Sequence, residues 1–303
     1  MPVRSLLHYA LEIPDQQIGQ RYYSDFGFQD VTGASNTVRL RPSTLEREQI
    51  QLLEGPKKRL HHLAFAAGGD DFAKLREALK VAGIPEVDPP RGADESGIWL
   101  LDPDGNYVNV RDEGVPKPPA DEPVKYNGPG NTSRIARRGV EAPVEHQVQP
   151  RRLGHVLLFT SDVARQLAFY QDVLGMKLSD RVGTESAFIR CSTDHHNLAL
   201  VKSSHKGFHH ASFEVGGVDE IALGAAQMRD RGWKPAWGLG RHCIGSNFFY
   251  YIRDPWGSYA EYFYDMDYIP EDFAWSARDW DPRFSLYLWG PNVPGDFTTN
   301  KEE

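Results

Sequence analysis

Two segments of this chain carry nearly the same eight-residue sequence. Residues 102–109 read DPDGNYVN, and residues 254–261 read DPWGSYAE. Further matching segments precede them in the same order, namely 7–15 with 154–162 and 60–69 with 208–217. A chain of 303 residues is long enough for two ordinary domains. The sequence is therefore an internal duplication, and its fold has to place two similar units in one chain.

Each copy predicts the same order of elements. An apolar strand opens each copy, at 6–13 and 153–160, and a helix follows it. In the second copy Ser161 or Asp162 is a suitable N-cap, and Gly175 is suited to ending the helix. The order is completed by β-rich segments, a strand with paired histidines, a second helix, and two strands around an Asp-Pro-x-Gly turn.

This order predicts an α+β fold built from tandem βαβββ modules, in which each copy forms an open mixed β-barrel with outer helices. A segment rich in proline, glycine and charge separates the copies, and an aromatic segment follows the second copy. We expect an N-terminal domain, a linker, a C-terminal catalytic domain and a tail at residues 1–115, 116–150, 151–267 and 268–303. The tail is expected to pack on the body, over the mouth of a site.

Composition excludes several classes of partner. The chain has 40% apolar and 25% charged residues, as soluble globular proteins do. It has neither an apolar run long enough to span a bilayer nor a secretory signal, so we expect no membrane partner. The presence of only two cysteines indicates a reducing compartment, and we expect a cytoplasmic protein. The formal net charge of −8 argues against nucleic acid as a partner.

Three residues of the second copy form a candidate metal site. They are His155 on the opening strand, His210 on the strand with paired histidines, and Glu261 on the last strand. Because they are far apart in sequence, only strands curled into one barrel can bring them together. Two imidazoles and one carboxylate with open positions beside them suit Fe(II) and oxygen chemistry, and Zn(II) and Mn(II) accept the same ligands. Burial of Glu261 without a cation or partner would be costly, which favours a metal site over an ordinary core.

The first copy has His8, His62 and Asn109 at the matching places. The neutral amide of Asn109 cannot supply the negative charge with which a carboxylate holds a divalent ion. We therefore expect that the first copy has lost its metal site and serves as a scaffold for the pair of barrels.

Three further residues of the second copy are candidates for acid–base or hydrogen-bonding roles. His196 is expected on a strand just before the paired histidines, and an imidazole can transfer protons near neutral pH. His242 precedes the last pair of strands, and Tyr251 lies just before the Asp-Pro-x-Gly turn. A surface histidine and a core tyrosine are the alternative interpretations of His196 and Tyr251. Because successive side chains alternate along a strand, we expect only one of His209 and His210 to face inward.

The chain resembles the type I extradiol ring-cleavage dioxygenases of the vicinal oxygen chelate superfamily over nearly its whole length. The motifs that carry the resemblance are LGHVLLFTSD, HHNLAL, HHASFEV, GRH and YIRDPWGSYAEYFYD. In that family the opening-strand histidine, a histidine of the paired strand and the last-strand glutamate hold Fe(II). The resemblance assigns these ligands to His155, His210 and Glu261, with Mn(II) as a second candidate metal.

The resemblance also implies an activity. The family's acid–base histidine corresponds to His196, with His195 as the alternative because the following segment is one residue shorter than in some members. The family's hydrogen-bonding histidine and active-site tyrosine correspond to His242 and Tyr251. The implied reaction is extradiol cleavage of a catechol-type diol by O2 in aromatic-compound catabolism, giving a muconic semialdehyde-type product. By the same resemblance we expect a homo-oligomer.

Two departures from the family bear on the substrate. Trp237 stands where homoprotocatechuate-type members carry an arginine for a substrate carboxylate, and Gly245 replaces an acidic residue of biphenyl-type members. The first departure suggests a substrate with an uncharged substituent. Phe188, Trp237, Phe248 and the aromatic tail are the candidate walls of its pocket.

Two other functions share parts of this pattern. A glyoxalase- or epimerase-type isomerase would use a divalent metal without oxygen, and its base would be a second glutamate. This chain offers His196 and Tyr251 instead. A non-enzymatic protein that sequesters small molecules would be about half this length and would lack the two histidines and the glutamate.

Overall fold

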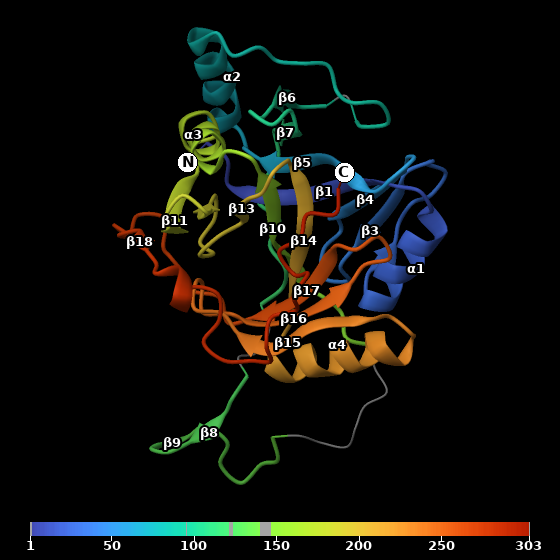
Figure 1. Cartoon of the computed structure of the whole chain (residues 1–303), viewed down its shortest axis with the longest axis vertical. Coiled ribbons are helices and arrows are strands. Elements are labelled where there is room, and N and C mark those ends of the chain that lie inside the picture. The colour runs from blue at the N-terminus through green and yellow to red at the C-terminus, as the bar shows by residue number, and fades with distance from the viewer. Residues whose placement is uncertain (1, 95, 121–123, 140–146, 303) are drawn as a thin grey trace.

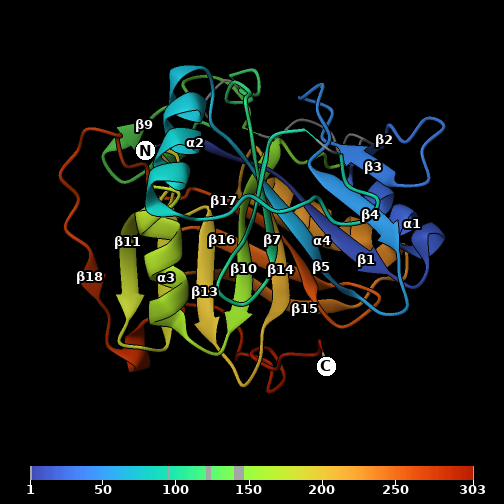
Figure 2. The same cartoon turned by 90° about the horizontal axis from the view of Figure 1, so that it is seen from above.

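The computed structural model describes residues 2–94, 96–120, 124–139 and 147–302, which form two sheet-rich units (Figures 1 and 2). The first unit is a seven-stranded mixed sheet in the order β2-β3-β4-β1-β5-β7-β6. Its elements are β1 (Ser5–Ile13), α1 (Gln16–Phe26), β2 (Gln29–Asp30), β3 (Val38–Arg41), β4 (Ile50–Glu54), β5 (Arg59–Ala66), α2 (Asp70–Ala82), β6 (Ile98–Leu101) and β7 (Tyr107–Arg111).

The second unit is a nine-stranded mixed sheet in the order β15-β16-β17-β14-β10-β13-β12-β11-β18. Its elements are β10 (Arg152–Thr160), α3 (Val163–Asp172), β11 (Lys177–Val182), β12 (Ser186–Arg190), β13 (Leu198–Lys202), β14 (Gly207–Glu214), α4 (Val218–Asp230), β15 (Pro235–Arg241), β16 (Phe248–Arg253) and β17 (Tyr259–Tyr264). In the sequence between the two units there is a short hairpin, β8 (Asn127–Gly128) and β9 (Asn131–Thr132), which projects from the body of the molecule (Figure 1). The tail adds β18 (Arg278–Asp279) and the short helix η1 (Pro282–Phe284).

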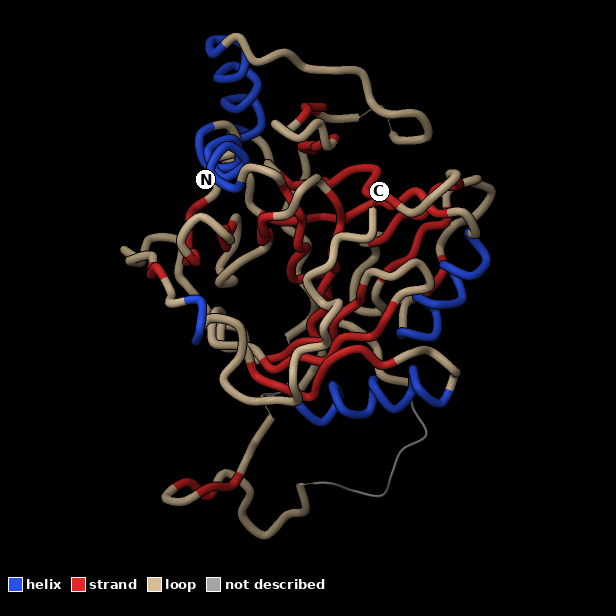
Figure 3. The backbone as a smooth tube through the Cα atoms, in the orientation of Figure 1, coloured by secondary structure: helices blue, strands red, loops and turns tan. Residues whose placement is uncertain are grey.

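This arrangement confirms the predicted α+β fold of tandem modules. In each unit the opening strand pairs with one parallel and one antiparallel neighbour, β4 and β5 for β1, and β13 and β14 for β10. The helices lie on the outer side of the strands, with α4 against β15–β17 and α1 against β3 and β4 (Figure 3). Within the described ranges, no helix is long and apolar enough to cross a membrane.

Local signals in the sequence set the ends of the first helix of each unit. The carboxylates of Asp15 and Asp162 accept the backbone N–H of Ile18 and Arg165, each at 3.0 Å. A side-chain acceptor at this position satisfies an amide that has no partner inside the helix. Gly27 ends α1 with a φ of 120°, a conformation that favours glycine.

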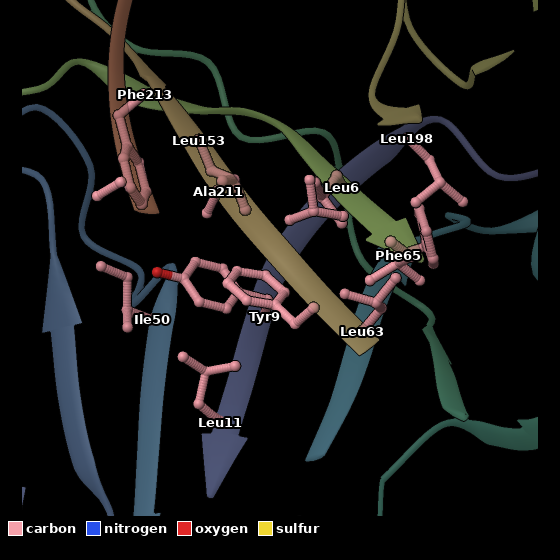
Figure 4. Close-up of a cluster of buried hydrophobic side chains, with 14 of the residues drawn as sticks. Leu6, Tyr9, Leu11, Ile50, Leu63, Phe65, Leu153, Leu198, Ala211 and Phe213 are labelled. Atoms are coloured by element: carbon pink, nitrogen blue, oxygen red, sulfur yellow. The ribbon is translucent and has the colours of Figure 1, made fainter. Parts of the chain in front are cut away.

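Successive side chains of β10 point alternately to the hydrophobic core and to a cavity. Val156 and Leu158 belong to the hydrophobic core, whereas His155, Leu157 and Phe159 line a cavity inside the second unit. Figure 4 shows this core, where side chains of β1, β4 and β5 lie close to those of β10, β13 and β14. Because side chains of a strand point alternately to its two faces, β10 both joins the two units and builds the cavity.

A β-bulge in β14 turns both paired histidines toward the cavity. Leu157 pairs with His210 and the next residue, Leu158, pairs with Phe208, so His209 is the extra residue of the bulge. Both histidines line the cavity, and the prediction that only one of them faces inward is wrong. Strand β5 has the matching irregularity against β1 in the first unit.

Tyr9 gives a test of the core between the units. Its side chain is fully buried, stacks on Phe208 with the ring centroids 5.3 Å apart, and donates its hydroxyl to Tyr23 at 2.9 Å. We expect Tyr9→Ala to reduce the free energy of unfolding by about 3–5 kcal/mol, because it leaves a large void. Thermal unfolding measures the change. Tyr268→Ala is the matched control, since that tyrosine is 70% exposed, and equal shifts for both variants would contradict the prediction.

Candidate functional site

A cavity of about 290 Å³ lies inside the second unit. Histidine, asparagine and tyrosine side chains line one end of it. Most of the remaining wall is apolar, although Glu185, Ser186, Ser285 and Thr298 also belong to it. Its apolar residues are Leu157, Phe159, Val182, Phe188, Ala199, Val201, Ile244, Pro282, Leu286 and Phe297. The cavity therefore combines a polar end that can do chemistry with a larger surface that suits an apolar ligand.

The walls of this cavity agree only in part with those predicted. Phe188 lines it, and the tail contributes to the lining. Trp237 and Phe248 do not line it, so these two predictions are wrong. Trp237 lies behind Tyr251, with parallel rings 5.7 Å apart, and Phe248 packs against Trp289. Trp237 itself therefore has no direct contact with the cavity.

Strands β10, β14 and β17 bring the three predicted ligands together. Glu261 Oε2 lies 3.3 Å from His155 Nε2 and 3.4 Å from His210 Nε2, and the two nitrogens are 3.3 Å apart. All three residues are buried, Glu261 completely. One potential ligand atom from each lies within 4.8 Å of the other two. This geometry could hold one metal ion.

The charges at this point also suit a cation. Glu261 Oε2 has no well-aligned hydrogen-bond donor among the described residues, and Asn247 donates to Oε1 at 3.4 Å. Burial alone would raise the pKa of Glu261, but its contact with His155 holds it below its ordinary value. Burial lowers the pKa of His210 to about 4. At neutral pH an ionised carboxylate therefore faces a neutral imidazole, and these are the states in which such side chains bind metals.

A chain of hydrogen bonds determines which nitrogen of His210 carries the proton. His209 Nε2 donates to the carbonyl oxygen of Phe297 at 2.6 Å, so the neutral ring of His209 accepts at Nδ1. His210 Nδ1 lies 2.6 Å from that nitrogen and donates to it. His210 Nε2 is then unprotonated where it faces Glu261, as a metal ligand has to be.

His196 lies in the loop before β13 and not on the strand, because β13 begins only at Leu198. Its ring lines the cavity, with its centroid 4.3 Å from that of His155 and 5.2 Å from that of Phe188. Burial is the largest cause that lowers the pKa of His196, so the ring is neutral near pH 7. The alternative candidate, His195, does not line the cavity.

His242 and Tyr251 are hydrogen-bonded to each other beside the carboxylate. His242 Nδ1 donates to the carbonyl oxygen of Leu286 at 2.7 Å, which leaves Nε2 to accept from the Tyr251 hydroxyl at 3.0 Å. Tyr251 lies directly opposite Glu261 on the neighbouring strand, and His242 Nε2 is 3.8 Å from Glu261 Oε1. Burial raises the pKa of Tyr251 well above its ordinary value, so its hydroxyl stays protonated.

The matching residues of the first unit meet without forming an anionic site. His8 Nε2 and His62 Nε2 are 2.9 Å apart. The side-chain oxygen of Asn109 accepts a hydrogen bond from Arg111 Nε at 2.8 Å. Arg111 is buried, and its place in the repeat is occupied by Phe263 in the second unit. A fixed guanidinium therefore lies beside the position that the carboxylate occupies in the other copy.

Some contributors to the site were not predicted. Asn247 donates to the carboxylate, His209 orients its neighbour, and the tail supplies the carbonyl oxygens of Leu286 and Phe297. The doubled histidine is a signal that could have identified His209. The carbonyl oxygens carry no signal in the sequence, because every residue has one.

The fold and the site define the class of this protein. Residues 152–262 match the Glyoxalase/Bleomycin resistance protein/Dioxygenase superfamily. The structure is similar to the Mn(II)-bound glyoxalase from Novosphingobium aromaticivorans, with a TM-score of 0.77 and 23% identity, over 97% of this chain and 93% of that chain. This similarity shows a shared vicinal oxygen chelate fold.

Relatives in sequence define the family more narrowly. Metapyrocatechase 2 of Cupriavidus necator is 45% identical, over 99% of this chain and 93% of the relative. The iron-dependent extradiol dioxygenase of Rhodococcus jostii is 30% identical, over 96% of this chain and 97% of the relative. The manganese-dependent 2,3-dihydroxybiphenyl 1,2-dioxygenase of Geobacillus genomosp. 3 is 24% identical, over 96% of each. The chain belongs to the extradiol ring-cleavage dioxygenases, oxidoreductases that use a non-haem metal ion, and this confirms the resemblance.

Gly245 gives a test of the polar end of the cavity. Its φ is +85°, and a Cβ atom added there would lie 3.2 Å from His196 Cε1 and 3.4 Å from Asn247 Oδ1. We expect Gly245→Ala to lower stability by about 1–2 kcal/mol and to slow turnover, because it strains the backbone and displaces His196. Gly232→Ala is the matched control, since Gly232 has a φ of +88° and no neighbour within 4 Å of the added atom. Equal turnover in the two variants would contradict the prediction.

Proposed function

We propose that this protein opens a catechol-type aromatic diol with O2 by extradiol cleavage, at one Fe(II) ion held by His155, His210 and Glu261. The product is a muconic semialdehyde-type compound. The proposal depends on one observation: one nitrogen atom of His155, one of His210 and one oxygen atom of the buried Glu261 carboxylate lie within 4.8 Å of one another. Membership in the family supports the reaction class.

Iron is the metal that we propose, although the ligand set also suits Mn(II) and Zn(II). The relative named as iron-dependent is 30% identical to this chain, and the one named as manganese-dependent is 24% identical. When bound, Fe(II) would hold the diol and O2 side by side and conduct electron density between them. Glu261 Oε2 has no well-aligned donor among the described residues, which supports a cation at this place, because a buried anionic oxygen without such a donor is costly.

The protein's own groups would orient the substrate and handle its protons. His196 would accept a proton from a substrate hydroxyl and later return it, since its ring is neutral and lines the polar end of the cavity. The Tyr251 hydroxyl could turn from His242 Nε2 to an oxygen atom of the reacting group. His242 is held by the carbonyl oxygen of Leu286 and would keep Tyr251 in place.

We further propose a substrate with an uncharged, apolar substituent. No lysine or arginine is among the described residues that line the cavity, and its one lining glutamate, Glu185, is exposed and pairs with Lys202 at 3.2 Å. A substrate carboxylate would lose its hydration in the apolar part without gaining a cation. An engineered cavity of about 150 Å³ accommodates benzene, so a cavity of about 290 Å³ leaves room for a substituent.

The first unit, in this proposal, binds no metal ion. Its amide Asn109 brings no charge, and the guanidinium of Arg111 is hydrogen-bonded to it at 2.8 Å. A positive charge beside His8 and His62 would repel a divalent ion. The unit would then act as a scaffold that packs against β10 and β14.

An isomerase without oxygen is less consistent with this cavity. That chemistry would need a second carboxylate as base close to the metal. Among the described lining residues only Glu185 has a carboxylate, and it lies exposed with Lys202 as its partner. His196 and Tyr251, which suit the dioxygenase, are buried at the polar end instead.

Metal analysis tests the proposed ligands. We expect one metal ion per chain, and we expect His210→Ala and Glu261→Gln to lose both the metal and turnover, because two remaining ligands hold a divalent ion weakly. His62→Ala, the matching change in the first unit, is the control and should keep one ion per chain. The metal content after anaerobic purification measures the outcome. A second ion that disappears with His62→Ala would contradict the metal-free first unit.

Oxygen uptake over a panel of diols tests the reaction and its specificity. We expect consumption of O2 with the appearance of a coloured ring-opened product for catechol and its alkyl-substituted derivatives. For a carboxylate-substituted catechol we expect a much higher KM, because the cavity offers no cation to its anionic group. No oxygen uptake with any diol by the iron-loaded protein would contradict the proposed function.

A further inference from the structure

Asp180, His195 and His196 form a line of buried groups between the tail and the cavity. His195 Nε2 lies 3.3 Å from Asp180 Oδ2, and His195 Nδ1 lies 3.1 Å from His196 Nδ1. None of the three residues is more than 4% exposed. This line is separate from the one that runs through His209 to the proposed metal ligand His210.

Asp180 is the acceptor at the outer end of the line. The backbone N–H of Arg278 donates to Oδ1 and the indole N–H of Trp280 donates to Oδ2, each at 2.8 Å. Burial alone would raise the pKa of Asp180, but hydrogen bonds from His195, Arg278 and Trp280 hold it below its ordinary value. An ionised carboxylate can only accept hydrogen bonds. His195 therefore carries a proton on Nε2.

The space between the two Nδ1 atoms admits one hydrogen atom. When the proton on Nε2 is the only one that His195 carries, its Nδ1 accepts, and His196 is the donor in this pair. His196 Nε2 is then left with a free electron pair on the side of the cavity. In the reverse arrangement His196 Nε2 would already carry a proton and could not accept one from a substrate.

Two other histidine pairs of the chain have the same arrangement. The Nδ1 atoms of His61 and His62 are 2.7 Å apart, and those of His209 and His210 are 2.6 Å apart. In each pair Nε2 of the outer ring faces a backbone carbonyl oxygen, at 3.1 and 2.6 Å. The outer ring of the pair His195 and His196 instead faces a side chain, the carboxylate of Asp180. Among these three pairs, only in this one can a side-chain substitution reverse the direction of the hydrogen bonds.

We propose that Asp180 and His195 are positioning residues that keep the unprotonated Nε2 of His196 directed into the cavity. The inference rests on the proposed function, in which His196 accepts the substrate proton. Asp180 and His195 are not among the residues that line the cavity, and in this proposal they act through His196, which His195 contacts. The tail takes part because Arg278 and Trp280 hold the carboxylate of Asp180 in place.

Asp180→Asn in the metal-loaded enzyme tests this arrangement, because the new amide can donate to His195 Nε2 and reverse the line. We expect kcat to fall by roughly 10²–10⁴-fold, the usual contribution of a general acid–base group, with KM and metal content unchanged. Trp280→Phe is the matched control. It removes one donor but leaves the acceptor, so kcat should fall by less than about tenfold, the effect of one hydrogen bond.

A double variant separates positioning from general damage to the site. If Asp180 acts only through His196, Asp180→Asn slows the His196→Phe enzyme no further. Losses in kcat that multiply in the double variant would overturn the proposal, since Asp180 would then act by another route. A kcat of the single Asp180→Asn variant equal to that of the wild type would also overturn it.

Anaerobic binding of 4-nitrocatechol gives a measurement that needs no turnover. The absorption spectrum of this diol reports the ionisation of its hydroxyl groups, and we expect it to be more ionised on the wild type than on Asp180→Asn. Identical spectra on the two proteins would overturn the positioning role. A wild-type enzyme that consumes no oxygen with any diol would count against the proposed function instead, and the spectra would still decide on the positioning role.

Discussion

A fully buried carboxylate determines what the second unit can do. Glu261 lies opposite Ser212 on β14, and Ser212 lies opposite His155 on β10, so one row across three strands sets the distance between the carboxylate and the first imidazole. His210 lies two residues along β14. An ionised carboxylate in such surroundings is unstable without positive charge or donors close to it. The register of the three strands therefore creates both the cost of burying a charge and the proposed ligand set that would relieve it by binding a cation.

Hydrogen bonds from the tail hold the imidazoles of the site in one orientation. The carbonyl oxygens of Leu286 and Phe297 accept from His242 and His209, and Trp280 donates to Asp180. None of these tail groups is a proposed ligand or proton carrier. A ring whose outer nitrogen is occupied in this way presents its other nitrogen to the cavity without a reorganisation cost at the moment of reaction. The tail thus matters to the chemistry through geometry, and its removal would disturb several imidazoles at once.

The duplication explains why so much of the site could be predicted from the sequence. Two aligned copies show which histidines occupy equivalent places, and the change from Asn109 to Glu261 singles out the copy that has the charge. The order of strands and helices could be predicted for the same reason, because each pattern occurs twice in the sequence. The bulge at His209 was missed because alternation assumes a regular strand, and nothing in the spacing shows where an extra residue is inserted. Asp180 was missed because its link to His196 depends on a three-dimensional contact between a loop and a neighbouring strand.

A comparison of the two units distinguishes the residues that the fold requires from those that the proposed chemistry requires. Both keep a pair of imidazoles with facing Nε2 atoms, 2.9 Å apart in the first unit and 3.3 Å in the second. Both keep a bulged histidine that donates to a backbone carbonyl. The first unit forms its sheet with Asn109 hydrogen-bonded to Arg111, so the barrel does not require a carboxylate at this place. A guanidinium at the position of Phe263 would compete with a metal ion for Glu261, whereas the apolar ring there would leave the carboxylate available to the proposed cation. In the proposed function, the pair of differences, amide for carboxylate and guanidinium for phenyl, would be sufficient in physical terms to convert one copy of the site into a scaffold.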